Sequence, residues 1–178
     1  MIPTIKTIAE LKKNINLGPG YGGYTEILKA VEIPFSEWET ICNFSEKSYT
    51  RNCLSCCEEY ELLLMCWNKD QGSPIHSYQS QESWLKVLKG ELTIDTYQVN
   101  KSDKTAVKTN SVVVQEGEFT YLNDSMGFHS IRNSGSEATT SLHLHIERIT
   151  EWEVFNAESK SINKENPTYD SISEDCEL

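Results

Sequence analysis

The sequence predicts a mostly β protein, an antiparallel barrel or jelly roll that follows a small helical N-terminal cap. From residue 49 onward, short β-type runs alternate with turn residues about ten times, a spacing typical of all-β barrels and jelly rolls. Before residue 45, apolar residues recur instead at helical spacing. A chain of 178 residues is long enough for one domain with a sizeable core. We therefore expect the cap in residues 1–44, the barrel in 45–156 and a tail in 157–178.

Three short helices are expected in the cap. The first covers residues 8–16, because Thr7 starts a capping box (Ser or Thr followed three residues later by Glu) and apolar residues then recur at helical spacing. A glycine cluster at 18–23 ends this helix. The second helix is expected at 25–32, and the third starts at Ser36, where the capping-box spacing occurs again.

The barrel strands are expected wherever a run of β-type residues lies between turn residues. About ten strands at this spacing fit an antiparallel barrel or jelly roll. The expected strands cover residues 49–52, 60–67, 74–78, 83–88, 91–98, 108–115, 119–121, 128–131, 140–146 and 153–155.

The composition narrows the classes of partner. A net charge of -11 argues against nucleic acid or an anionic membrane, because both need a basic surface. No apolar run approaches the roughly 20 residues of a membrane span, and the N-terminal residues lack the apolar core of a signal peptide. We expect a cytoplasmic protein that is a monomer.

The tail, residues 157–178, holds six acidic and two basic residues and few large apolar ones. Such a segment buries too little apolar surface to offset the entropy that it would lose on ordering. We expect the tail to be disordered and assign it no function.

Six cysteines are expected to be free thiols in a reducing compartment. Cys53 and Cys56 form a C-x-x-C pattern, which can indicate zinc or redox chemistry. No second C-x-x-C and no nearby histidine pair completes a four-ligand site. A turn between two strands is therefore the favoured interpretation of this pattern.

His76 and Tyr78 mark a candidate metal site. They lie two residues apart in one strand, so their side chains point to the same face and into one cavity. His129 lies at the start of a later strand. A single strand histidine is usually a hydrogen-bonded residue without a catalytic role. Two histidines at strand positions, His76 and His129, instead favour a metal site at the mouth of a barrel.

Five stretches carry a resemblance to a known family. They are Tyr49-Thr-Arg51-Asn52, Leu64–Trp67 with Gly72–His76, Trp84–Leu92, Tyr121–His129 and Ser141–His145. In order and spacing they resemble the cysteine dioxygenase family, thiol dioxygenases with the cupin fold. The resemblance covers residues 49–145, most of the expected barrel.

The resemblance implies an Fe(II) enzyme whose substrates are L-cysteine and O₂ and whose product is cysteine sulfinate. In the family three histidines hold the iron; His76 and His129 match two of them, and Tyr78 occupies the third position. Arg51 matches the residue that holds the substrate carboxylate, a role suited to its planar fork of donors. The alternative is that Arg51 is a structural ion-pair partner, but its Tyr-Thr-Arg-Asn context favours substrate binding. Tyr49, on the same strand face as Arg51, is expected to position the substrate or a neighbouring side chain.

The family also has a cysteine–tyrosine thioether crosslink near the metal. The matching positions are Ser83 and His145, so this crosslink cannot form here. In the family a serine and a histidine form a relay that orients the phenol. Ser141 and His143 match that relay, which is expected to end on the imidazole of His145.

Three interpretations of Tyr78 stay open. It can bind iron as a phenolate, a hard ligand that favours Fe(III). It can stay protonated, with a water or His145 completing the metal site, and we slightly favour His145 over phenolate ligation. Alternatively, the site binds no metal.

These observations favour an iron-dependent thiol dioxygenase active in cysteine catabolism and taurine biosynthesis. The alternative is a cupin pseudoenzyme that binds a small thiol or amino acid without turnover. A third, weaker option is another dioxygenase chemistry on a changed metal, because fold alone does not fix function.

Overall fold

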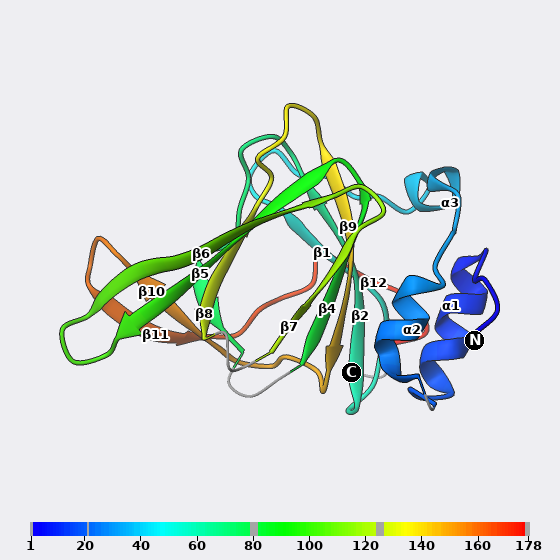
Figure 1. Ribbon diagram of the computed structural model, residues 1–178, viewed down its shortest axis with the longest axis horizontal. Helices are drawn as coiled ribbons and strands as arrows, with labels where there is room; N and C mark the ends of the chain where they lie inside the picture. The colour runs from blue at the N-terminus through cyan, green and yellow to red at the C-terminus, as the bar shows by residue number, and fades with distance from the viewer. Residues whose placement is uncertain (1, 21, 79–81, 124–126, 177–178) are drawn as a thin grey trace.

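A computed structural model describes residues 2–20, 22–78, 82–123 and 127–176. Its elements follow one another in the order helical cap, then strands (Figure 1). The helices are α1 (Ile8–Asn16), α2 (Gly23–Lys29) and α3 (Phe35–Glu39). The strands are β1 (Thr50–Cys56), β2 (Tyr60–Trp67), β3 (Ile75–Ser77), β4 (Ser83–Lys89), β5 (Glu91–Asn100), β6 (Thr105–Gln115), β7 (Phe119–Leu122), β8 (Phe128–Arg132), β9 (Thr139–Ile146), β10 (Trp152–Asn156), β11 (Ser161–Glu165) and β12 (Ser171–Ile172).

The described strands form two six-stranded sheets. One has the order β12-β1-β2-β9-β4-β7 and the other β11-β10-β3-β8-β5-β6. Neighbouring strands are antiparallel except β1 and β12, which are parallel. The fold is a cupin jelly roll with a small helical cap, so the predicted fold class is confirmed.

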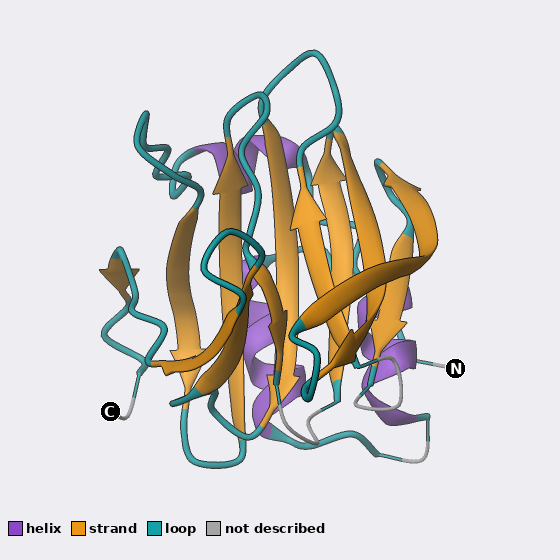
Figure 2. Cartoon of the chain, turned by 90° about the vertical axis from the view of Figure 1, so that its left-hand side faces the viewer, coloured by secondary structure: helices purple, strands orange, loops and turns teal. Residues whose placement is uncertain are grey.

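Strand β2 is buried on both faces because two cores meet on it. Leu62 and Leu64 belong to the core between the sheet and the helices, whereas Leu63 and Met65 belong to the core inside the barrel. Side chains alternate between the faces of a strand, so an uninterrupted apolar run is what such a position requires. Figure 2 shows the helices behind this sheet, on the outside of the barrel.

Lys86 of β4 fixes the helical cap to the sheet. Its buried ammonium donates hydrogen bonds to the carbonyl oxygens of Leu28 (3.0 Å) and Val31 (2.7 Å), which end α2 and its following turn. The indole Nε1 of Trp84 donates to Thr25 Oγ1 at 2.8 Å. No described helix has the length and apolar character needed to span a membrane.

The helix starts differ from one another. At α1 the hydroxyl of Thr7 accepts a hydrogen bond from the Glu10 amide (3.1 Å), as the capping box predicts. At α3 the predicted capping box at Ser36 is wrong, because Pro34 is the N-cap residue and no side chain caps the helix. Proline fixes its own φ near the helical value, so the helix begins one residue early and Ser36 falls inside its first turn.

The acidic tail differs from the disorder that its composition predicts, for the residues up to 176 that the structure describes. Strand β11 pairs with β10, and β12 pairs with β1. Two of its charged residues form ion pairs with the rest of the molecule: Lys164 with Glu151 at 2.6 Å and Asp175 with Lys12 at 2.7 Å. Backbone pairing to two sheet edges and these ion pairs order the tail without much apolar burial.

Candidate metal and substrate site

His76 and His129 lie opposite each other on neighbouring strands inside the barrel. They are cross-strand partners on β3 and β8, with ring centroids 4.4 Å apart. Both side chains are buried, with exposed fractions of 1% and 3%. The antiparallel register of two short strands therefore places two imidazoles side by side.

The two imidazoles share a hydrogen-bonding arrangement. His76 Nδ1 lies 2.8 Å from the Pro74 carbonyl oxygen, and His129 Nδ1 lies 3.5 Å from that of Gly127. A carbonyl only accepts, so Nδ1 carries the proton and Nε2 presents a lone pair. Both Nε2 atoms are buried without a partner among the described residues. Backbone carbonyls that orient metal-binding histidines in this way are usual in metal sites, so the pair fits a metal ion.

Tyr78 packs against three histidine rings. Its ring centroid lies 4.8 Å from that of His76, 4.9 Å from His129 and 5.0 Å from His145, each in an edge-on arrangement. Burial raises the pKa of Tyr78 above its usual value of about 10. Without a metal, this side chain is therefore a neutral phenol.

The ligand atoms of His145 do not converge with those of His76 and His129. Its Nε2 lies 4.0 Å from a carboxylate oxygen of Glu61, and its Nδ1 has no partner among the described residues. Within the described chain, only a group of three cysteines brings three imidazole, thiol or carboxylate ligand atoms within 4.8 Å of one another. For His145 to complete a site with His76 and His129, its side chain would have to move.

All four histidines of the chain are buried and neutral at neutral pH. Burial lowers the pKa of His129 to about 4 and that of His143 to about 3. Burial also places the pKa values of His76 and His145 well below the usual range, with further lowering by neighbouring histidines. Neutral imidazole is the form that binds metal ions.

His143 is fixed by a hydrogen-bonded chain. The Trp67 indole Nε1 donates to Ser141 Oγ at 2.9 Å, and Ser141 Oγ lies 2.8 Å from His143 Nε2. Tyr49 stacks on Trp67, with ring centroids 4.6 Å apart and planes at 20°. The predicted relay is therefore present as far as His143, whose ring centroid lies 6.2 Å from that of His145.

Arg51 forms an ion pair whose partner, Glu61, the sequence analysis did not identify. Its Nη2 donates to a carboxylate oxygen of Glu61 at 3.0 Å, and the Tyr169 hydroxyl donates to the other oxygen at 2.5 Å. The guanidinium carbon lies 5.5 Å from the ring centroids of both Trp152 and Tyr169. The signal for Glu61 was visible, because it is the only charged residue of β2. Tyr169 gave no signal, since it lies in a tail that composition predicts to be disordered.

Arg51 retains a free donor for a ligand. Its Nε is buried and has no hydrogen-bond partner among the described residues. An unpaired buried donor costs free energy, so a carboxylate or other acceptor that reached this atom would be favoured.

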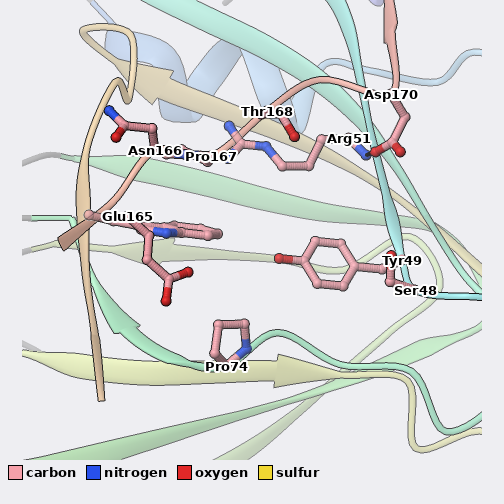
Figure 3. A pocket seen from close by; sticks show the side chains of 10 residues that line it. Ser48, Tyr49, Arg51, Pro74, Glu165, Asn166, Pro167, Thr168 and Asp170 are labelled. Atoms are coloured by element: carbon pink, nitrogen blue, oxygen red, sulfur yellow. Dashed lines mark hydrogen bonds between the residues drawn. The ribbon is translucent and has the colours of Figure 1, made fainter. Parts of the chain in front are cut away.

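Two cavities meet at a shared wall. The outer one, which we call the vestibule, has a volume of about 340 Å³. It is lined by Ser48, Tyr49, Arg51, Pro74, Trp152, Glu165, Asn166, Pro167, Thr168 and Asp170 (Figure 3). The inner one borders His76, His143 and His145 and holds only about 10 Å³, roughly the room for one water molecule. Tyr49, Arg51 and Trp152 line both cavities and so separate the vestibule from the histidines.

Comparison with known proteins gives a consistent result. The family model for cysteine dioxygenase type I matches residues 22–158, more than half of the chain. The chain belongs to the cysteine dioxygenase family. It is 32% identical over 149 residues to the cysteine dioxygenase type 1 of Homo sapiens, covering 82% of this chain and 74% of that one. The Rattus norvegicus cysteine dioxygenase type 1 is 29% identical over 148 residues, with the same coverage.

Solved structures support the fold alone. A crystal structure of a Thermus thermophilus protein superposes with a TM-score of 0.52 at 12% identity, covering 62% of this chain and 94% of that one. A Bacillus halodurans protein gives a TM-score of 0.51 at 14% identity, covering 65% and 80%.

Ser83 and His145, the two positions that the sequence analysis matched to the family's crosslink, are neighbours in the structure. Ser83 on β4 and His145 on β9 are directly opposed in the sheet. Ser83 Oγ is buried without a partner among the described residues. The backbone geometry that would bring a cysteine and a tyrosine together is retained, but the two side chains cannot form a thioether.

Proposed function

We infer from its membership of the cysteine dioxygenase family that the protein is an oxygenase of thiols. We propose, more specifically, that the enzyme depends on Fe(II) and oxidises L-cysteine with O₂ to cysteine sulfinate. The observation that carries this proposal is the pair of buried, unpartnered Nε2 atoms of His76 and His129. Tyr78, which contacts both rings, is the proposed third donor, with His145 as the alternative that needs a movement.

Iron bound at this site would supply open coordination positions for the thiol and for O₂. The reaction adds both atoms of O₂ to the substrate sulfur, so a thiol becomes a sulfinic acid without another reductant. The two neutral imidazole ligands would preserve positive charge that attracts a thiolate.

The protein supplies binding and orientation. Arg51, which lines both cavities and has an unpartnered Nε, would donate a hydrogen bond to the substrate carboxylate. Tyr49 lies on that same wall, and Figure 3 shows its phenol directed across the vestibule. The inner cavity of about 10 Å³ is too small for cysteine, so binding requires this wall or Tyr78 to move. His143, which forms a hydrogen bond with Ser141, borders the inner cavity. It would orient the side chains around the bound substrate.

The test is elemental analysis of anaerobically purified protein, followed by oxygen uptake on addition of L-cysteine. We expect close to one iron per chain, cysteine-dependent uptake, and loss of iron in His76→Ala and His129→Ala. Ser130→Ala, adjacent to His129, is the control and should retain iron. If the wild-type chain takes up no iron even after reconstitution with Fe(II), the proposal fails and a thiol-binding pseudoenzyme takes its place.

Cysteine catabolism, a contribution to taurine biosynthesis, a cytoplasmic location and a monomeric state stay predictions of the sequence. They follow from this proposed activity and from composition.

A further inference from the structure

Three cysteines outside the histidine cluster meet at the edge of the barrel. Cys53 and Cys56 lie on β1, and Cys176 lies near the end of the chain. Their sulfur atoms all lie within 4.8 Å of one another, and those of Cys53 and Cys176 are 2.8 Å apart. Cys53 and Cys56 are buried, whereas Cys176 is half-buried.

The backbone builds this cluster. Residues three apart in a regular strand point to opposite faces, but the pairing of β1 with β2 shifts register between Cys53 and Ser55. Such a bulge inserts one residue and turns the following side chains over, which lets Cys53 and Cys56 share a face. The backbone of Cys176 pairs with that of Cys56 in an isolated parallel β-bridge, which brings the Cys176 side chain to the other two cysteines.

The tail is also anchored just before Cys176. The Ser173 amide donates to the Cys53 carbonyl oxygen at 2.9 Å. Lys12 of α1 binds Asp175 at 2.7 Å. Cys176 therefore reaches the two strand cysteines because the backbone on its N-terminal side is anchored.

We propose that Cys53, Cys56 and Cys176 form a binding site for a thiophilic cation, Zn²⁺ or Cu⁺, other than the iron site. Thiolate sulfur selects these two ions among the metals of proteins. With a Zn–S bond of about 2.3 Å and tetrahedral angles, bound sulfur atoms lie about 3.8 Å apart. All three sulfur atoms of the cluster lie within 4.8 Å of one another. Those of Cys53 and Cys176, 2.8 Å apart, would have to separate by about 1 Å to bind one zinc ion.

Burial holds the strand thiols of the cluster in their neutral, protonated form. Burial raises the pKa of Cys56 to about 11, while the positive charge of Arg148 acts to lower it. Burial also raises the pKa of Cys53. Without a cation the thiols stay protonated, and cation binding would release protons, as it does at other thiolate sites.

The site would tie the end of the chain to β1. Three protein ligands leave the fourth zinc position open to water. Since a metal that binds only the folded state stabilises it, occupancy would raise the unfolding temperature of the protein.

The experiment uses the full chain, reduced and kept anaerobic, titrated with Cd²⁺ as a spectroscopic substitute for Zn²⁺. Cadmium bound to thiolate gives an ultraviolet charge-transfer absorption that histidine ligands do not give. We expect this absorption to saturate at one equivalent, and to weaken in affinity by at least roughly tenfold in Cys53→Ser, Cys56→Ser and Cys176→Ser. Competition with Zn²⁺ and Cu⁺ then shows which ion binds tighter.

Two controls separate this site from other ligands. The first is Cys57→Ser, next to Cys56 in the sequence. The Cys57 thiol donates to the Glu59 carboxylate at 3.0 Å and is not part of the cluster, so this variant should leave metal binding unchanged. The double variant His76→Ala/His129→Ala should keep the absorption while losing iron. Absence of the absorption in the wild-type chain, its loss in Cys57→Ser, or a Cys53–Cys176 disulfide that replaces metal binding would each overturn the proposal.

Discussion

Glu61 is a carboxylate in an otherwise apolar strand, and its side chain has no solvent exposure. It faces Arg51, the residue proposed to hold a substrate carboxylate. An internal carboxylate and a substrate carboxylate therefore compete for one guanidinium. This pairing bears directly on which thiols the enzyme accepts.

Glu61→Gln is expected to strengthen the binding of thiols that carry a carboxylate. Without the competing charge, Arg51 gains about one further charge-assisted hydrogen bond to the substrate, about 1.5 kcal/mol, so the KM for L-cysteine should fall roughly tenfold. Steady-state oxygen uptake with L-cysteine and with cysteamine, a thiol without a carboxylate, measures this. An equal change of KM for both thiols would contradict it. Because the variant leaves Arg51 without its buried partner, its thermal unfolding is recorded alongside.

The third iron ligand is decided by a matched pair of variants. Tyr78→Phe removes only the phenol oxygen and should reduce iron affinity by roughly tenfold or more, whereas His145→Ala should leave it unchanged. Iron content after dialysis against a chelator gives the comparison. The reverse pattern would make His145 the ligand and would require its side chain to leave Glu61.

At the scale of elements, the sheet of β5, β6 and β8 is held together around Asp95. This buried carboxylate accepts hydrogen bonds from Lys108 Nζ (2.6 Å) and Ser111 Oγ (2.5 Å), both on β6. The Arg132 Nε of β8 lies 3.8 Å away. One residue thus links its own strand to both of its neighbours.

The pKa of Asp95 leads to a prediction about stability and pH. Burial acts to raise this pKa, but the hydrogen bonds from Lys108 and Ser111 and the nearby charges outweigh it, so the pKa is lowered. A carboxyl whose pKa is lowered by folding stabilises the folded state above its unfolded value, about 3.9, and loses that contribution as the pH falls further. We expect Asp95→Asn to cost about 1 kcal/mol at pH 7, since Lys108 is half exposed.

Urea unfolding of wild type and Asp95→Asn between pH 7 and pH 3 tests this. The difference in unfolding free energy should shrink below about pH 4. The exposed turn residue Asp103, changed to Asn, is the control. If the difference in unfolding free energy between wild type and Asp95→Asn does not change with pH, the charge of Asp95 does not contribute to stability.

At the scale of the whole molecule, local patterns and long-range contacts were not equally predictable. The bounds of β2 and α1 match the sequence analysis, because periodicity and flanking turn residues are local signals. The register that opposes His76 to His129 is not local. It was nevertheless implied by the order of motifs in a family resemblance.

The parts that sequence missed depend on residues far apart in the chain. Tyr169 contacts Glu61 across 108 positions, and Cys176 contacts Cys53 across 123. Composition alone takes no account of contacts with the rest of the chain. It therefore predicted disorder for the tail, whose strands β11 and β12 pair with the edges of the two sheets. Glu61 was also missed as the ion-pair partner of Arg51, because a single charge in an apolar strand does not name its partner.

The vestibule has one wall from the barrel and another from the tail, since Glu165, Asn166, Pro167, Thr168 and Asp170 all border it. A protease cut between β11 and β12 would therefore not trim a dispensable appendage. It would remove one wall of the vestibule and admit bulkier thiols to the face of Arg51. The selectivity of such an enzyme could change through its last residues while every residue of the barrel stays the same.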